Sequence, residues 1–138
     1  MKKEEFCVGV SEIDITPPVG TLLAGGIKPR VSIGIQDPLY VKALYIETEN
    51  GEKFVYVVMD LLFLTREIGD KCVKLASEKI NIPEENVVWT TTHTHTGPYT
   101  SSLFGEDEKV INKEWLEKLP EKFANAVEKA YFQEKEQG

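Results

Sequence analysis

The fold is decided by the stretch Phe54-Val55-Tyr56-Val57-Val58-Met59-Asp60. It belongs to a strand pattern that extends from Lys53 to Leu64. Its nearly continuous apolar character is typical of a central strand that is covered on both faces. Asp60 interrupts the apolar run, and its carboxylate needs a partner because an unpaired buried charge is costly. Two roles are open for Asp60: a backbone cap or cation partner, or an acceptor that orients a histidine.

A helix and a second strand are predicted to follow. Thr65 is the expected N-cap, and Glu67 lies in the first turn, where the helix dipole favours an anion. Apolar residues then recur at helical spacing and form one stripe. These residues are Ile68, Cys72, Leu75, Ala76 and Ile80. Residues 81–86 end the helix and residues 87–92 predict the next strand. The order strand, helix, strand favours parallel pairing of the two strands, with the helix on a face of the sheet.

The second strand leads into the only two histidines of the chain, His93 and His95. Residues i and i+2 of an extended segment project to the same face, so the two imidazoles can converge on one point. Imidazole is the commonest metal ligand and suits proton transfer near neutral pH. The pattern alone fits equally a pair of hydrogen-bonded histidines that cap a strand end. In open α/β sheets ligands gather at the carboxyl ends of the strands, where both Asp60 and His93 are expected to lie.

The N-terminal side of the chain adds two strand patterns, Phe6–Ile15 and Leu39–Thr48. The second is joined to the strand at 53–64 by residues 49–52, whose Asn-Gly pair strongly predicts a β-hairpin. Residues 20–36 are expected to form a long irregular loop, which is more often functional than idle. Within this loop the pair Gly25-Gly26 is the point where the backbone can approach a ligand closely.

A second long helix is predicted after Asn112, its candidate N-cap. Apolar residues keep helical phase through Pro120, where the proline can kink or restart the helix. They are Trp115, Leu116, Leu119, Phe123, Ala126, Val127, Ala130 and Tyr131. In total we expect five or six strands and two main helices, forming an α/β domain with a mixed β-sheet and flanking helices.

Composition narrows the function classes. The chain has 138 residues, the size of one domain, with 41% hydrophobic and 28% charged residues. A formal net charge of -7 argues against nucleic acid as a partner. No signal peptide core or bilayer-spanning run is present, which predicts a cytoplasmic location and no stable membrane insertion. Nothing in the spacing of Cys7 and Cys72 favours a disulfide.

Four segments, in the same order, resemble the N-terminal catalytic region of the neutral/alkaline non-lysosomal ceramidase family. They are Val8–Val10 with Asp14–Pro18, Gln36–Leu44, Val57–Leu62, and Asn86–Val87 leading into Thr92–Pro98. The last segment is close to the family signature His-Thr-His-Ser-Gly-Pro, with Thr96 in place of the serine. Because threonine keeps the hydroxyl, the departure is mild.

The resemblance implies a ceramidase-like layered sandwich, of which residues 1–138 are the N-terminal portion of the catalytic domain. It implies a Zn²⁺-dependent amidohydrolase that cleaves the N-acyl amide of ceramide-like lipids to a fatty acid and a sphingoid base. By the match to the signature, His93 is implied as the zinc ligand and His95 as the catalytic histidine beside the metal. Gly25 is implied as part of the substrate pocket.

Members of this family are several times longer, and their remaining zinc ligands and catalytic serine lie in later segments. The remaining part of the catalytic domain, or another chain, is therefore expected to complete the site. The isolated chain is expected to lack substantial amidase activity, and a truncated domain would leave one sheet edge and one apolar face uncovered. Two alternatives stay open: a non-catalytic metal-binding or interaction domain, and a hydrolase of the same family that acts on a different amide or ester.

Overall fold

The computed structural model describes residues 6–102 and 105–137 of the chain. Four strands form a mixed sheet in the order β1-β4-β5-β6. Their bounds are β1 Phe6–Asp14, β4 Tyr40–Thr48, β5 Lys53–Met59 and β6 Val87–Thr91. The β1–β4 and β4–β5 pairs are antiparallel, and the β5–β6 pair is parallel. The predicted mixed α/β class is confirmed.

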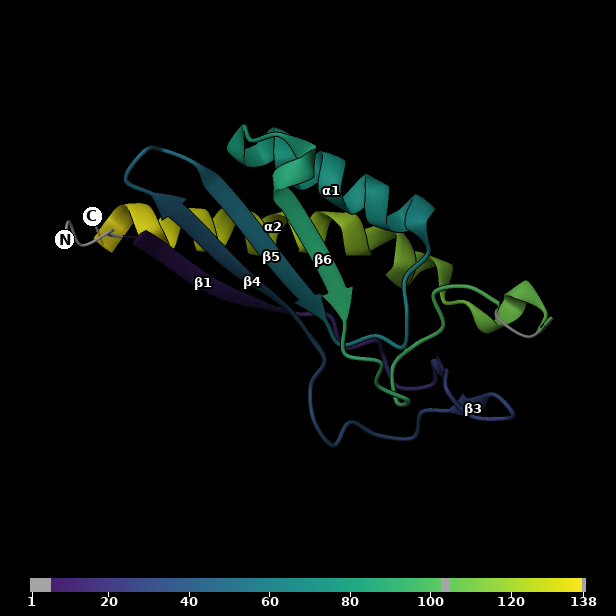
Figure 1. The fold of residues 1–138 in the computed structure, drawn as a ribbon. Coiled ribbons are helices and arrows are strands. Elements are labelled where there is room, and N and C mark those ends of the chain that lie inside the picture. Colours follow the sequence, from purple (N-terminus) through teal and green to yellow (C-terminus); the bar gives the residue numbers. More distant parts are fainter. Residues whose placement is uncertain (1–5, 103–104, 138) are drawn as a thin grey trace.

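Two helices, α1 (Arg66–Ile80) and α2 (Lys113–Gln137), pack on one face of this sheet. Figure 1 shows α2 passing behind the strands. Ser11 of β1 donates a hydrogen bond to the carbonyl of Ala126 in α2. Gly69 of α1 lies against the indole ring of Trp89 in β6. Because these contacts come from odd-numbered strand residues, the odd-numbered side of the sheet faces both helices.

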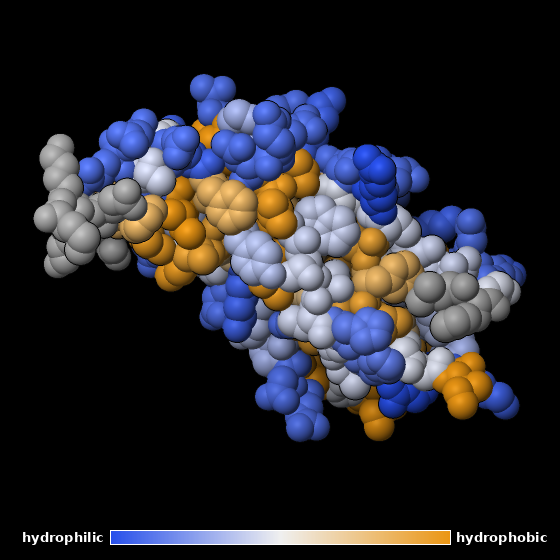
Figure 2. Space-filling view, in the orientation of Figure 1, coloured by the Kyte–Doolittle hydropathy of each residue, from blue (hydrophilic) through white to orange (hydrophobic). Residues whose placement is uncertain are grey.

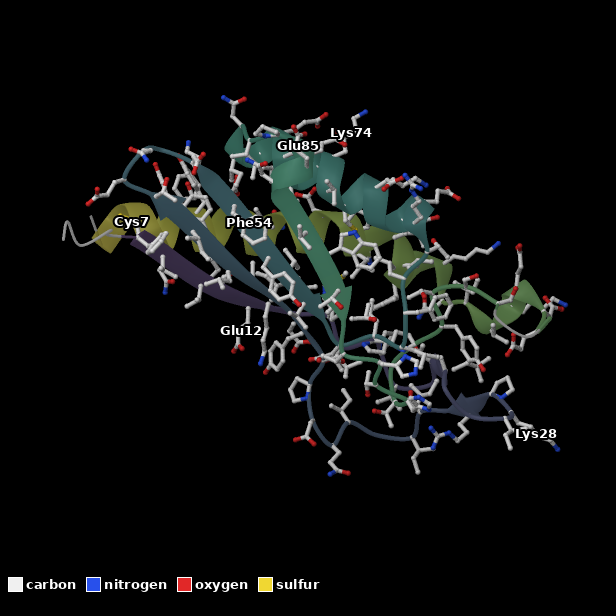
Figure 3. All side chains as sticks on the ribbon, viewed as in Figure 1. Cys7, Glu12, Lys28, Phe54, Lys74 and Glu85 are labelled. Atoms are coloured by element: carbon white, nitrogen blue, oxygen red, sulfur yellow. The ribbon has the colours of Figure 1, made fainter. Side chains whose placement is uncertain are left out.

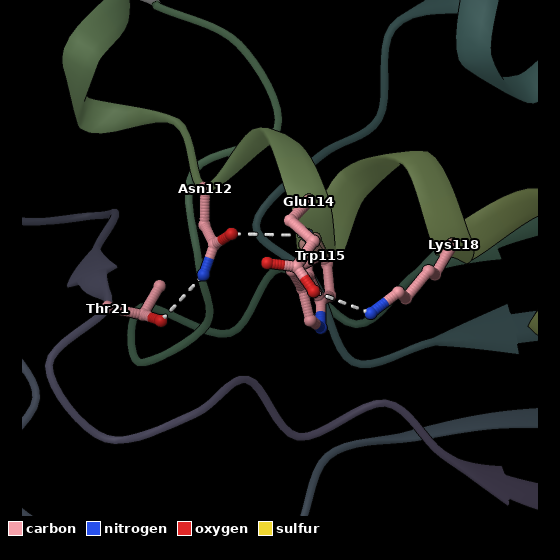
Figure 4. Close-up of polar contacts among 5 residues, drawn as sticks. All are labelled: Thr21, Asn112, Glu114, Trp115 and Lys118. Atoms are coloured by element: carbon pink, nitrogen blue, oxygen red, sulfur yellow. Dashed lines mark hydrogen bonds and ion pairs between the residues drawn. The ribbon is translucent and has the colours of Figure 1, made fainter.

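Local signals define the turns and the helix ends as the sequence predicts. Gly51 adopts a φ of 80° in the hairpin between β4 and β5. Thr65 caps α1, accepting a hydrogen bond from the backbone N–H of Ile68. Asn112 caps α2 by accepting a 3.1 Å hydrogen bond from the N–H of Trp115, as Figure 4 shows. The second helix continues as one element through Pro120 and does not restart there.

The expectation that residues 54–59 are covered on both faces is wrong for the described part of the chain. Val55, Val57 and Met59 face the helices and have no exposed surface, whereas Phe54 is 40% and Tyr56 is 37% exposed. The physical reason is that both helices lie on the same side, so the strand is central in its sheet but buried on one face only. The strand also ends at Met59 and does not run to Leu64, because the chain turns there toward α1.

The expected irregular loop at 20–36 is partly ordered as a small antiparallel ladder. Its strands are β2 (Leu22–Leu23) and β3 (Arg30–Val31). This hairpin docks on the segment after β6, since Ala24 donates a 2.8 Å hydrogen bond to the carbonyl of Gly97. Two short 3-10 helices complete the described elements, η1 (Glu84–Asn86) and η2 (Glu108–Val110).

Candidate functional site

The candidate site lies beyond the carboxyl ends of the parallel strands β5 and β6. Figure 1 shows the segment after β6 and the β2–β3 hairpin gathered at this end of the sheet. Asp60 follows β5 directly, and the histidine segment follows β6. A 3.0 Å hydrogen bond from the N–H of Thr92 to the carbonyl of Met59 joins the two strand ends. The parallel pairing predicted from the strand-helix-strand order therefore brings these residues to one edge.

Both imidazoles are held through the same ring nitrogen by backbone carbonyls. The Nδ1 of His93 lies 2.9 Å from the carbonyl oxygen of Leu62. The Nδ1 of His95 lies 2.9 Å from the carbonyl oxygen of Gly25. A carbonyl can only accept, so in the neutral imidazole each Nδ1 carries the proton and each Nε2 keeps its lone pair. This tautomer is the one that suits a metal ligand or a general base at Nε2.

The two rings lie close together, with centroids 4.9 Å apart and planes at 79°. Their approach depends on a turn at His93, whereas the sequence predicted an extended segment there. His93 has a φ of 61°, in the left-handed region that non-glycine residues rarely adopt. Such strained conformations concentrate at functional sites, where the surrounding structure holds them.

Gly25 is tied to His95 by geometry as well as by its carbonyl. It has a φ of 93°, and a Cβ added there would lie 2.7 Å from the Cα, Cβ and Cγ of His95. No side chain fits at this distance, so only glycine allows the hairpin backbone to reach the imidazole. The residue proposed from the sequence as part of a pocket therefore also orients a histidine.

Asp60 makes two contacts that brace the strand ends. Its Oδ2 accepts a 3.0 Å hydrogen bond from the N–H of Tyr40, and its Oδ1 accepts a 3.2 Å hydrogen bond from the hydroxyl of Thr92. The first contact is the backbone-capping role. The second reaches the residue directly before His93, so an orienting effect of Asp60 on that histidine would act through Thr92 and stays a prediction.

The two histidines open onto a cavity of about 660 Å³. Its other walls are mainly apolar or bare backbone. They are formed by Gly25, Gly26, Ile27, Leu62 and Phe63. Sequence analysis missed Leu62, both as a wall and as the carbonyl that holds His93, because the apolar residues after Asp60 were assigned to the strand. Arg30 was also missed, and its guanidinium donates a 2.9 Å hydrogen bond to the carbonyl of His95.

The donor set fits part of a zinc site. Zinc in proteins prefers nitrogen and sulfur ligands, and the two imidazoles that line the cavity are nitrogen donors of this kind. Within residues 6–102 and 105–137, no group of three or more His, Cys, Asp or Glu side chains could hold a metal ion. A catalytic zinc needs about three protein ligands, so the described residues can supply some of them but not all.

Tyr99 is packed beneath the site, not in it. It is buried with Ala24 and Leu62, and so supports the two segments whose carbonyls hold the histidine rings. Burial, together with Glu106, raises the pKa of the Tyr99 phenol, which therefore stays protonated at neutral pH.

Among the helices that the structure describes, none is long and apolar enough to cross a membrane.

Comparisons with known proteins give one family model and two similar solved structures. A family model described as neutral/alkaline non-lysosomal ceramidase, N-terminal, matches residues 6–130. A crystal structure of neutral ceramidase from Pseudomonas aeruginosa is 21% identical with a TM-score of 0.76, over 96% of this chain and 22% of that chain. A ceramidase complexed with C2 is 21% identical with a TM-score of 0.70, over 95% of this chain and 22% of that chain. No curated protein matches the chain.

The two solved structures establish the fold, and the chain spans about a fifth of their length (22% of each). The family model covers residues 6–130, nearly the whole sequence. The match includes both histidines, the glycine that packs on His95 and the strands that position them. The chain therefore belongs to the neutral/alkaline non-lysosomal ceramidase family, matching its N-terminal region.

Proposed function

We propose that this chain is the N-terminal part of a zinc-dependent amidohydrolase that cleaves the N-acyl amide of ceramide-like lipids to a fatty acid and a sphingoid base. The observation that carries the proposal is the pair of imidazoles fixed through Nδ1 to the carbonyls of Leu62 and Gly25. Both rings line a cavity of about 660 Å³ with mainly apolar walls. Family membership supports the same reading.

The proposed roles follow from this geometry. His93 would hold the metal through Nε2, and the carbonyl of Leu62 keeps that nitrogen's lone pair available. When bound, zinc supplies Lewis-acid stabilisation of the developing oxyanion and lowers the pKa of water. His95 would accept or return a proton at Nε2 as water adds to the carbonyl carbon and the C–N bond breaks. Ile27, Leu62 and Phe63 offer apolar surface to an acyl chain.

The proposed zinc site also needs metal ligands from outside the described residues. The described residues include no group of three possible metal ligands, so the remaining ligands would come from the rest of the catalytic domain or from another chain. We propose that the isolated chain hydrolyses ceramide-like substrates poorly for this reason.

The same shortage of ligands favours a second candidate, a metal-binding or interaction domain without its own chemistry. A third candidate, a hydrolase of the same family with another amide or ester as substrate, shares the site and differs only in the pocket. Turnover of N-acyl sphingoid bases against simple N-acyl amides and esters, measured with the completed site, separates the first candidate from the third.

Zinc binding by the purified chain tests the metal assignment. The wild type, His93→Ala and His95→Ala are titrated with zinc by calorimetry, with Thr94→Val as a control between the two histidines. We expect a loss of zinc affinity in His93→Ala, a smaller loss in His95→Ala and none in Thr94→Val. Equal affinity in the wild type and in His93→Ala would contradict the role of His93 as a ligand.

A further inference from the structure

Arg30 reaches the histidine segment from the β2–β3 hairpin, although it does not line the cavity. Its guanidinium donates a 2.9 Å hydrogen bond from Nη2 to the backbone carbonyl of His95, 65 residues away along the chain. A Cβ added to Gly26 would lie 3.5 Å from Nε of Arg30, so the guanidinium passes over the bare backbone of the Gly25–Gly26 turn. The side chain thus extends from one strand of the hairpin to the residue that is proposed to move the proton.

The hairpin holds both the ring and the main chain of His95. The carbonyl of Gly25 lies 2.9 Å from Nδ1 and fixes the orientation of the ring. Arg30 holds the carbonyl of His95, and because the peptide group is planar, the direction of that carbonyl sets the ψ angle of the residue. Two contacts from one hairpin therefore restrain the backbone and the side chain of His95 together.

The hairpin is itself anchored to the segment that carries His95. The N–H of Ala24 donates a 2.8 Å hydrogen bond to the carbonyl of Gly97, and Leu23 forms an antiparallel bridge with Pro98. Arg30 is opposite Leu23 in the β2–β3 ladder. β2 is thus bound to this segment through its backbone, and β3 reaches the same segment through the Arg30 side chain.

The charge pattern of the hairpin distinguishes Arg30 from an ordinary surface cation. Lys28 and Arg30 are the only charged residues between positions 15 and 36. Within the described residues Arg30 forms no ion pair, so a carbonyl and not a carboxylate fixes its guanidinium. Figure 3 shows Lys28 in the hairpin turn, pointing outward, and Figure 2 shows hydrophilic and hydrophobic side chains next to one another at this end of the molecule. Of the two cations in the hairpin, Arg30 is the one that contacts the site.

We propose that Arg30 is a positioning residue for His95. It acts through the His95 carbonyl and keeps the ring on the carbonyl of Gly25, so that Nε2 remains the nitrogen with the lone pair. A guanidinium suits this task because its planar fork presents N–H donors in a fixed geometry and stays charged at any working pH. The inference rests on the role proposed above for His95, but it concerns only how the ring is held.

The tautomer of His95 in the chain without metal or substrate tests this inference. Nitrogen chemical shifts of the neutral rings give the ratio of the Nδ1–H form to the Nε2–H form. Arg30→Met keeps a long side chain without a donor, and we expect it to lower this ratio for His95 by about threefold to tenfold, the effect of losing one hydrogen bond at the surface. Arg30→Lys keeps a cationic donor and should recover part of the loss. His93, which is held by Leu62, should keep its ratio.

Lys28→Met is the matched control, because it removes the same charge from the same hairpin and Lys28 takes no part in holding His95. It should leave the ratios of both histidines unchanged. Urea denaturation of each variant separates positioning from stability, since an exposed side chain should change the free energy of unfolding little in either variant.

An unchanged His95 ratio in Arg30→Met, or an equal fall in Lys28→Met, would overturn the proposal. Equal falls for His93 and His95 together with a loss of stability would overturn it as well, because Arg30 would then support the fold as a whole. None of these measurements depends on zinc binding or turnover. A failure of the proposed function, seen in the zinc titration, is therefore distinguished from a failure of this inference.

Discussion

Replacement of Gly25 by alanine isolates the contact that orients His95. The new methyl group meets the Cα, Cβ and Cγ of His95 at 2.7 Å, and the residue must hold a φ of 93°. Positive φ costs a non-glycine residue about 1–2 kcal/mol. Overpacking against a fixed neighbour adds a further ~1–3 kcal/mol. We expect Gly25→Ala to lower the free energy of unfolding by both amounts, or to relieve the clash by moving the hairpin and releasing the His95 ring.

Gly20 is an internal control for the backbone part of this loss. It has a φ of 95°, nearly that of Gly25, but no atom lies within 4 Å of its added Cβ. Gly20→Ala therefore carries the positive-φ cost without the clash. The difference between the two variants in urea denaturation measures the contact with His95 alone.

Nitrogen chemical shifts of the imidazoles provide the second assay. Release of the His95 ring removes the acceptor at Nδ1, so Gly25→Ala should shift the tautomer balance of His95 and leave that of His93 largely unchanged. Equal destabilisation by both glycine variants, with an unaltered His95 tautomer, would refute the close-approach argument.

Two further predictions concern a helix cap and the thiols. Asn112→Ala removes the acceptor for the first turn of α2 and the 3.2 Å hydrogen bond that the Asn112 amide donates to the hydroxyl of Thr21. It should lower the free energy of unfolding by about 1 kcal/mol in thermal or urea denaturation. Asn112→Asp keeps the acceptor and should retain most of this stability. Burial raises the pKa of the Cys72 thiol to about 12, so this group is protonated at pH 8 and should react with a thiol reagent only on unfolding, whereas the exposed Cys7 should react in the native protein. Comparable native rates for Cys7→Ser and Cys72→Ser would contradict the buried environment of Cys72.

The secondary structure was largely predictable because its signals are local. The Asn50-Gly51 turn, the caps at Thr65 and Asn112 and the alternation of strand and helix each depend on a few neighbouring residues. Parallel pairing of β5 and β6 followed from chain order, and it correctly brought Asp60 and His93 to one edge.

The one-sided burial of β5 was not predictable from its own residues. An apolar run indicates that a strand can be covered on both faces. The segments that cover it lie elsewhere in the chain, so the strand's own residues do not show where they pack. Because both helices pack on one side, Phe54 and Tyr56 stay exposed within the described residues.

The histidine supports were missed for a different reason. The atoms that fix the rings are the backbone carbonyls of Leu62 and Gly25, and every residue has a carbonyl, so side-chain identity carries no signal for them. The sequence shows only that residue 25 is a glycine in a loop, and the positive φ and the close approach to His95 explain why a residue without a Cβ is needed there.

The carbonyls that hold the two rings also determine when the site forms during folding. They lie 31 residues from His93 and 70 residues from His95 along the chain. Closing such distant contacts is slow compared with forming a helix or a hairpin, so the imidazoles acquire their final tautomer late. Binding of an ion that recognises only the ordered rings is coupled to docking of the hairpin. The free energy by which docking strengthens ion binding equals the free energy by which the bound ion stabilises docking. The ordered histidine pair therefore reports that folding is complete. A metal ion that binds only this ordered pair would favour the last step of folding, the docking of the hairpin.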